Sequence, residues 1–143
     1  MWKKLLAASL TTGMLLTSLS MTAEAAAVEK TEKVVQTAGR NALGTFAPEF
    51  AHYNDDVLFG ENWNNQDIDL KTRSIITVVS LMSMGITDSS LKYHLTNAKN
   101  HGVSQKEISA IITHVAFYAG WPKAWAVFNL AKEVWPVEES DKK

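Results

Sequence analysis

Two side chains in apolar helical surroundings are the best candidates for chemistry. His94 lies in a stripe that includes Leu91 and Leu95, and histidine titrates close enough to neutral pH to act as a general acid or base. Arg73 lies in residues 70–84, a stretch that is apolar almost all round. Its guanidinium must find an anion, because an unpaired buried charge is very costly. The two residues are therefore predicted to be the catalytic pair of a site that binds a carboxylate.

Each of these residues also has a purely structural interpretation. A lone histidine on an apolar face is more often a satisfied core residue than a catalyst. Arg73 could instead form an ion pair within the chain, with Glu61, Asp67, Asp69 or Glu107. His101 lies two turns beyond His94, about 10 Å away by the helix rise. Two histidines that far apart cannot bind one metal ion directly, so we expect no metal site.

Further side chains could line the same site. Glu107, His114 and Tyr118 follow one flank of a helix at i, i+7 and i+11, although a capping box also explains Glu107. Trp63 and Trp121 offer ring surfaces that could wall a small pocket, although core packing is the commoner fate of tryptophan. Thr77 lies in the polar strip of residues 70–84 and is added to this set. The predicted substrate-binding residues are therefore Trp63, Thr77, Glu107, His114, Tyr118 and Trp121.

The helices that carry these residues have clear boundary signals. Side chains that accept amide hydrogen bonds precede three of them, and glycines that can adopt left-handed geometry follow two. The expected N-caps are Asp69, then Thr87 or Asp88, and then Ser104, which forms a capping box with Glu107. The expected ends are at Gly85 and Gly102. No strand pattern competes, so we predict an all-α fold with residues 70–84 as its buried central helix.

The other helices are expected toward the two ends of the domain. One should begin before Val34, and another should run from Pro48 to Gly60. The last should run from Pro122 to about Trp135 and bury Trp125, Val127, Phe128 and Ala131.

The first residues have the pattern of a cleavable signal peptide. Lys3 and Lys4 precede a mostly apolar run, and small residues surround Ala25. We therefore expect residues 1–25 to be a signal peptide and the protein to be exported, to the periplasm or beyond, with no stable membrane anchor after cleavage. Residues 26–45 should form a flexible leader and the first helix, residues 46–136 the helical domain, and residues 137–143 a disordered tail.

Composition excludes several classes of function. The formal net charge is −1 with no basic cluster, which argues against a nucleic-acid partner. There is no cysteine, so the chain has no disulfide, no thiolate metal ligand and no thiol redox chemistry. A chain this short, with abundant apolar helix faces, also gains from assembling with copies of itself.

Four stretches together resemble the carboxymuconolactone decarboxylase family. In chain order they are FGENW, LKTRSIITVVSLMSMG, LKYHLTNAKNHGVSQKEI and AFYAGWPKAW. The resemblance runs from about residue 46 to residue 135. It implies the helical protomer of the alkylhydroperoxidase D-like fold, assembled as a homotrimer or homohexamer with the site near the subunit contacts.

The peroxidase branch of this fold implies a different chemistry from the one expected here. That branch carries a CxxC pair with a histidine four residues after the second cysteine. By resemblance, His94 matches that histidine, but Thr87 and Ser90 stand at the cysteine positions, and Ser74 stands at an acidic proton-relay position. The chain therefore resembles the decarboxylase branch and should not be a thiol peroxidase.

The resemblance implies loss of CO₂ from a small carboxylated lactone or related unsaturated acid, without a cofactor. Arg73 would hold a carboxylate and His94 would protonate the carbanion. Thr77, His114 or Tyr118 would donate to the lactone oxygen between tryptophan walls. Two alternatives remain open: another cofactor-free proton-transfer reaction, such as isomerisation or lactone hydrolysis, and a non-catalytic exported module that binds small acids.

Overall fold

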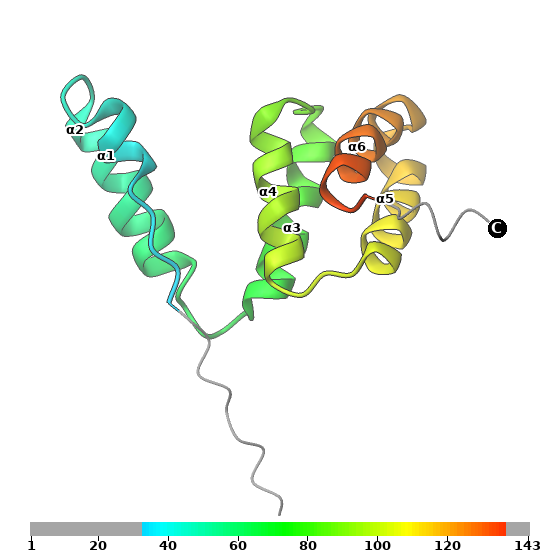
Figure 1. The fold of residues 1–143 in the computed structure, drawn as a ribbon, viewed down its shortest axis with the longest axis horizontal. Coiled ribbons are helices and arrows are strands. Elements are labelled where there is room, and N and C mark those ends of the chain that lie inside the picture. The colour runs from blue at the N-terminus through cyan, green and yellow to red at the C-terminus, as the bar shows by residue number, and fades with distance from the viewer. Residues whose placement is uncertain (1–32, 137–143) are drawn as a thin grey trace, which may run out of the picture. The chain divides into compact units, whose positions relative to one another are not determined.

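The computed structural model describes residues 33–136, and every regular element within them is a helix (Figure 1). In chain order the elements are α1 (Ala38–Leu43), α2 (Pro48–His52), the π-helix η1 (Tyr53–Asn62), α3 (Leu70–Met84), α4 (Ser89–Asn100), α5 (Gln105–Ala119) and α6 (Trp121–Val134). The prediction of an all-α fold is confirmed. The expected signal peptide at residues 1–25 and the expected tail at residues 137–143 lie outside the described residues.

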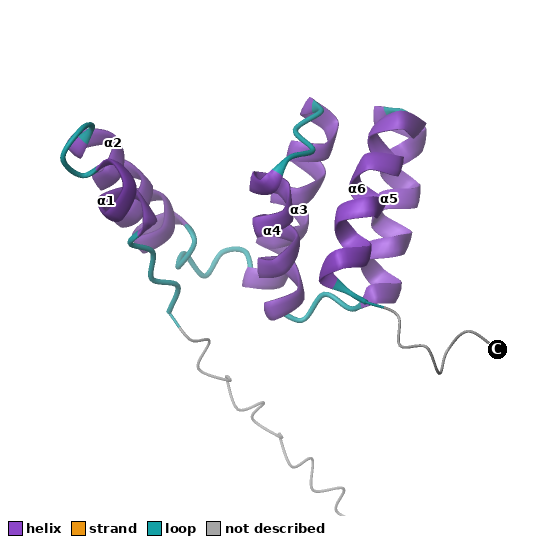
Figure 2. Ribbon diagram, turned by 45° about the horizontal axis from the view of Figure 1, so that its top comes forward, coloured by secondary structure: helices purple, strands orange, loops and turns teal. Residues whose placement is uncertain are grey.

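Helices α3 to α6 pack into one bundle (Figure 2). Helix α3 contacts α4, α5 and α6, and α6 also contacts α4 and α5. The apolar side chains that this packing buries most completely are Val78, Met82, Leu91, Leu95, Ile112 and Val127. No helix in residues 33–136 is both long enough and apolar enough to cross a bilayer.

The local boundary signals of the bundle are confirmed. The Asp69 carboxylate accepts the Thr72 amide, and Asp88 rather than Thr87 caps α4. The capping box between Ser104 and Glu107 is complete in both directions. Gly85 and Gly102 have φ values of 82° and 86°, the left-handed geometry that glycine adopts without a steric cost.

Helices α1, α2 and η1 pack on one another, and we call them the N-terminal hairpin. Buried Asp55 from η1 accepts the amides of Gly39 and Arg40 at 2.9 and 2.8 Å, so it caps the first turn of α1 from a distance. Gly39 permits this approach, because a Cβ there would lie 2.7 Å from the Asp55 carboxylate and 3.1 Å from Ala51.

Removing the Asp55 charge is expected to destabilise the hairpin in a pH-dependent way. Burial alone would raise the pKa of Asp55, but hydrogen bonds from the Arg40 amide, Asn54 and the Gly39 amide outweigh burial and lower it from 3.8. A lowered folded-state pKa stabilises the fold above the unfolded value, and this contribution disappears as the pH falls below 3.8. Asp55→Asn should lower the melting temperature by about 5 °C at pH 7, the size expected for a lost helix cap. Melts at pH 7 and pH 3 test this, and an equal difference at both would contradict it.

Two expectations for the N-terminal half were wrong. Residues 33–37 are not helical, and the first helix of the described residues begins at Ala38. The backbone of this segment hydrogen-bonds to side chains instead. Gln36 accepts the Thr37 and Ala38 amides, and the Asn64 side chain accepts the Val34 amide and donates to the Val34 carbonyl. The helix that starts at Pro48 also passes the expected end at Gly60 as a π-helix, whose wider hydrogen bonding includes Trp63 N–H to Leu58 C=O at 2.9 Å.

Burial in the bundle also differs from expectation. In α6, Ala124, Val127 and Ala131 face the core and Phe128 is half-buried, but Trp125 is 69 % exposed. Trp125 lies outside the inward-facing side of α6, which Ala124, Val127 and Ala131 define. Helix α3 makes the central contacts predicted for it, yet Ile76 on its outer side is half-exposed.

Candidate active site

Trp63 brings the two halves of the described chain together. It follows η1 in a turn, and its side chain is buried. Its ring stacks on His94 of α4 with centroids 6.2 Å apart, and it contacts His101 in a tilted arrangement with centroids 6.1 Å apart. Tyr93 adds an edge contact to His94 at 5.1 Å. Two of the predicted site residues, Trp63 and His94, therefore lie in one cluster.

His94 is a half-buried imidazole whose Nδ1 is buried without a hydrogen-bond partner among residues 33–136. Burial lowers the pKa of His94 below 6.5, because desolvation disfavours the charged form. The ring is therefore neutral at pH 7, and it retains a polar atom that a ligand could engage.

His101 and Ser74 form a polar pair beside this cluster that the sequence analysis did not assign to the site. Buried Ser74 donates its hydroxyl hydrogen to the Leu70 carbonyl at 2.7 Å, and its Oγ lies 2.8 Å from Nδ1 of His101. Because a hydroxyl has one hydrogen, the histidine must donate here, which leaves its Nε2 as an acceptor. The signal available in the sequence was the i, i+7 spacing of His94 and His101, which places both histidines on one side of their helix.

Arg73 binds neutral oxygens rather than the carboxylate expected for it. Its guanidinium donates to Asn62 Oδ1 at 3.2 Å and to the carbonyls of Asn65 and Ile68 at 2.9 and 3.3 Å. Its Nε is buried without a partner. Within residues 33–136 no carboxylate forms an ion pair with it, which contradicts the structural alternative of a pair with Glu61, Asp67, Asp69 or Glu107. Arg73 thus holds the loop next to Trp63, while no carboxylate of the described residues pairs with its positive charge.

Thr77 and Glu107 are occupied by structural contacts. The Thr77 hydroxyl donates to the Arg73 carbonyl at 3.0 Å within α3. Glu107 binds Lys71 at 2.7 Å and the capping-box groups of Ser104. The Lys71 ammonium, with Ser104, lowers the pKa of Glu107 to about 2. A carboxylate held this firmly in its charged form is not a proton donor at neutral pH.

The other three predicted residues lie on the outside of the bundle. His114 and Tyr118 contact each other with ring centroids 5.1 Å apart, and Trp121 contacts Phe117 at 5.5 Å. Trp121 also lines an apolar groove of about 270 Å³ with Ala124, Trp125, Phe128 and Lys132. In the described part of the chain, no hydrogen bond, ion pair or ring contact joins this set to Trp63 and His94.

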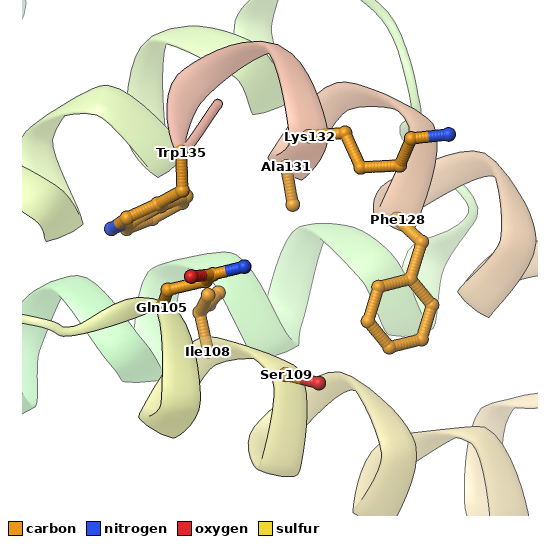
Figure 3. Close-up of a pocket in the computed structure, with 7 residues that line it drawn as sticks. All are labelled: Gln105, Ile108, Ser109, Phe128, Ala131, Lys132 and Trp135. Atoms are coloured by element: carbon orange, nitrogen blue, oxygen red, sulfur yellow. The ribbon is translucent and has the colours of Figure 1, made fainter. Parts of the chain in front are cut away.

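A smaller cavity of about 80 Å³ separates α5 and α6 (Figure 3). Gln105, Ile108 and Ser109 line it from α5, Phe128, Ala131 and Lys132 line it from α6, and Trp135, which directly follows α6, completes the lining. The Trp135 indole donates to the Val103 carbonyl at 3.2 Å. No predicted site residue lines this cavity, and among residues 33–136 no group of three or more acidic or histidine side chains is placed to hold a metal.

Comparison with known proteins decides the family. The model of the carboxymuconolactone decarboxylase family matches residues 48–133. The chain belongs to this family. That match contains Trp63, Arg73, Ser74, His94 and His101, so the whole cluster lies within the family's domain.

Two relatives of this decarboxylase-family chain differ in what is known of them. A 4-carboxymuconolactone decarboxylase from Acinetobacter baylyi is 33% identical over 92 residues, which span 64% of this chain and 68% of that protein. An uncharacterised 15.0 kDa protein from Paracoccus denitrificans is 23% identical over 87 residues, which span 60% of this chain and 65% of that protein. The chain thus matches about two thirds of the length of each.

Proposed function

We propose that this protein is a cofactor-free lyase that removes CO₂ from a small carboxylated lactone or a related unsaturated acid. The observation that carries the proposal is the state of Arg73: its guanidinium holds a loop through neutral oxygens, and its charge has no carboxylate partner among the described residues. A guanidinium matches a carboxylate in two parallel hydrogen bonds. The activity of the Acinetobacter baylyi relative supports the same substrate class.

The reaction needs a cation that holds the substrate carboxylate, an electron sink and a proton donor. Arg73 would hold a carboxylate, and the apolar wall of Trp63 would weaken hydration of the carboxylate that leaves. When the carbon–carboxylate bond breaks, its electron pair moves into the unsaturated lactone system and CO₂ departs. His94, in its protonated form, would then transfer a proton to the carbon that carried the carboxylate. The conjugated substrate accepts the electron pair itself, so no cofactor is required.

The pH dependence of catalysis is expected to show that bound substrate raises the pKa of His94. Burial holds its pKa below 6.5 in the free protein, whereas a nearby carboxylate favours the charged imidazolium and raises the pKa. The fraction of protonated His94 falls as pH rises through its pKa. As the pH rises, kcat/KM, which reports the free enzyme, should therefore fall with a midpoint below pH 6.5. The fall in kcat, which reports the enzyme–substrate complex, should have its midpoint at a higher pH. Coincident limbs would contradict this account.

The neutral state of His94 also favours a second candidate function. A neutral imidazole with a free Nδ1 can abstract a proton as a general base, as isomerisation of an unsaturated acid requires. In that case kcat/KM would rise, not fall, as pH passes the pKa of His94.

A product assay distinguishes these functions. The protein is incubated with carboxylated unsaturated lactones, and released CO₂ and the remaining ligand are measured by headspace analysis and NMR. Loss of CO₂ supports the lyase, and a rearranged or hydrolysed ligand without CO₂ supports the proton-transfer enzyme. Binding of an unchanged ligand would reject both and leave a small-acid-binding module.

We also propose that the protein is exported after cleavage near Ala25. Support comes from the sequence pattern of residues 1–25, which lie outside the described part. Mass spectrometry of the exported protein should give an N-terminus at Ala26 or Val28, and an intact Met1 in the mature protein would reject cleavage.

A further inference from the structure

His101 is the titratable side chain of the Trp63 cluster to which the proposed reaction gives no role. Its Nδ1 lies 2.8 Å from Ser74 Oγ, and its ring contacts the Trp63 ring with centroids 6.1 Å apart. The imidazole is half-buried, and its Nε2 makes no hydrogen bond within residues 33–136. One ring nitrogen is therefore held by the fold, and the other is left for a ligand.

The position of His101 is fixed through its backbone as well as its side chain. It ends α4, and the amides of Gly102 and Val103, which follow it, bond carbonyls of the last turn at 3.0 and 2.9 Å. These two bonds form a Schellman motif, which favours the left-handed glycine found at position 102. With this motif on its backbone and Ser74 on its ring, the imidazole has little freedom to reorient.

Ser74 determines which nitrogen of His101 carries the hydrogen. The serine is 1 % exposed, and its hydroxyl donates to the Leu70 carbonyl at 2.7 Å. A carbonyl has no hydrogen to offer, so this contact uses the only hydrogen of the hydroxyl, and Ser74 can only accept from the imidazole. Nδ1 is therefore protonated and Nε2 carries a lone pair. The same contacts exclude a serine nucleophile, because the histidine of such a pair must accept the hydrogen of the serine.

An acceptor nitrogen requires a hydrogen-bond donor on the ligand. Burial lowers the pKa of His101 below 6.5, so the ring is neutral at pH 7 and has no hydrogen on Nε2. A carboxylate gains no hydrogen bond opposite a lone pair, whereas a hydroxyl group supplies the missing hydrogen. Arg73, the residue before Ser74 in α3, provides the cation for a carboxylate. The site thus offers different partners to two different groups of one ligand.

We propose that His101 is a ligand-binding residue whose Nε2 accepts a hydrogen bond from a hydroxyl group of the substrate. The preferred substrates are then unsaturated acids or lactones that carry a hydroxyl group in addition to the carboxylate. Ser74 is a positioning residue, because it holds the imidazole in the accepting tautomer. The inference rests on the proposed function only in assigning the carboxylate to Arg73.

Nitrogen NMR of the histidine side chains tests the tautomer without a ligand. Above pH 7, wild-type His101 should give the signals of an imidazole protonated at Nδ1. Ser74→Ala removes the acceptor, so the hydrogen should move toward Nε2. Ser80→Ala is the matched control, because Ser80 donates to the carbonyl of Ile76 at 2.8 Å in the same way but has no histidine partner within the described residues. It should leave the His101 signals unchanged. A wild-type imidazole protonated at Nε2 would overturn the proposal.

Binding of matched probes tests the contact itself. The probes are the positional isomers of hydroxybenzoate and the corresponding methoxybenzoates, unsaturated acids in which the methyl ether keeps the oxygen but not the hydrogen. Wild type should prefer at least one hydroxybenzoate to its ether. His101→Phe keeps a ring against Trp63 but has no acceptor, so this preference should fall by roughly 3- to 10-fold, the size of one net hydrogen bond. Comparing preferences between variants cancels the steric effect of the methyl group.

Ser74→Ala should also reduce the preference, because an imidazole free to carry its hydrogen on Nε2 can donate to the ether oxygen. Ser80→Ala should keep the wild-type preference. If His101→Phe does not fold, Ser74→Ala provides the decisive measurement, and an unchanged preference beside a changed tautomer would reject the contact.

The contact and the proposed reaction fail in different ways. If no CO₂ is released but the preference for a hydroxybenzoate depends on His101, the reaction is wrong and the contact stands. If CO₂ is released but no hydroxybenzoate is preferred, or the preference is equal in wild type and His101→Phe, the contact is wrong and the reaction stands.

Discussion

Replacing His94 with glutamine is expected to lower turnover by about 10²–10⁴-fold, the usual contribution of general acid–base catalysis. Glutamine keeps a polar side chain of similar reach but cannot titrate, so it can neither deliver nor accept the proton. Binding of a carboxylated substrate should weaken far less than turnover, because His94 is neutral in the free protein and its Nδ1 makes no hydrogen bond within the described residues. Steady-state kinetics and ligand titration on the same preparation check the two parts of this result.

The matched control is His52→Gln, the same change at an exposed histidine of the hairpin that bonds only Asp56. It should leave turnover unchanged. If His94→Gln instead melts early while its folded fraction turns over normally, His94 is a packing partner of Trp63 and not the proton donor. That result would move the search to His101, whose Nε2 is held as an acceptor by Ser74.

Replacing Arg73 with methionine is expected to weaken binding of carboxylate ligands by about 2–5 kcal/mol, the range for truncating one partner of a buried charge pair. The lower end is the better expectation, because Arg73 is only half-buried. The melting temperature should also fall, since the guanidinium holds the loop through Asn62, Asn65 and Ile68. A methyl ester of the same ligand separates the two effects. Its binding should change little if Arg73 acts on the carboxylate, and should weaken equally if the loop alone is disturbed.

Lys71→Met provides a charge-matched control on the same helix. It also removes one positive charge from α3, but it disrupts only the pair with Glu107. Carboxylate affinity should therefore remain near wild type. Equal losses in Lys71→Met and Arg73→Met would indicate a general effect of net charge and would reject a specific clamp at Arg73.

Signals confined to a few neighbouring residues allowed much of the fold to be predicted. The bounds of α3 follow from Asp69 and Gly85, and the start of α5 follows from the capping box, because each motif satisfies backbone groups within one turn. The side of α4 that carries Leu91 and Leu95 was likewise identified from spacing alone.

Features that depend on distant partners were missed. The apolar surroundings of Arg73 indicated that it needed an anion, whereas neutral oxygens from the preceding loop bind its guanidinium. Spacing could not identify Ser74 as the partner of His101, since 27 residues separate them. Trp125 was expected to be buried because it is apolar, but Ala124, Val127 and Ala131 form the inward side of α6 and leave Trp125 69 % exposed.

The π-helical form of η1 has a consequence for how this sequence can change over evolutionary time. In a π-helix each amide bonds the carbonyl five residues earlier, so each hydrogen-bonded turn contains one residue more than in an α-helix. Deleting one residue between Tyr53 and Asn62 while the run keeps its π spacing would turn every following side chain by about a quarter of a turn about the helix axis. Trp63 comes directly after this run and would then rotate away from His94 and His101. The number of residues in this segment should therefore be under stronger selection than most of their identities, and a homologue one residue shorter here should have replaced Trp63.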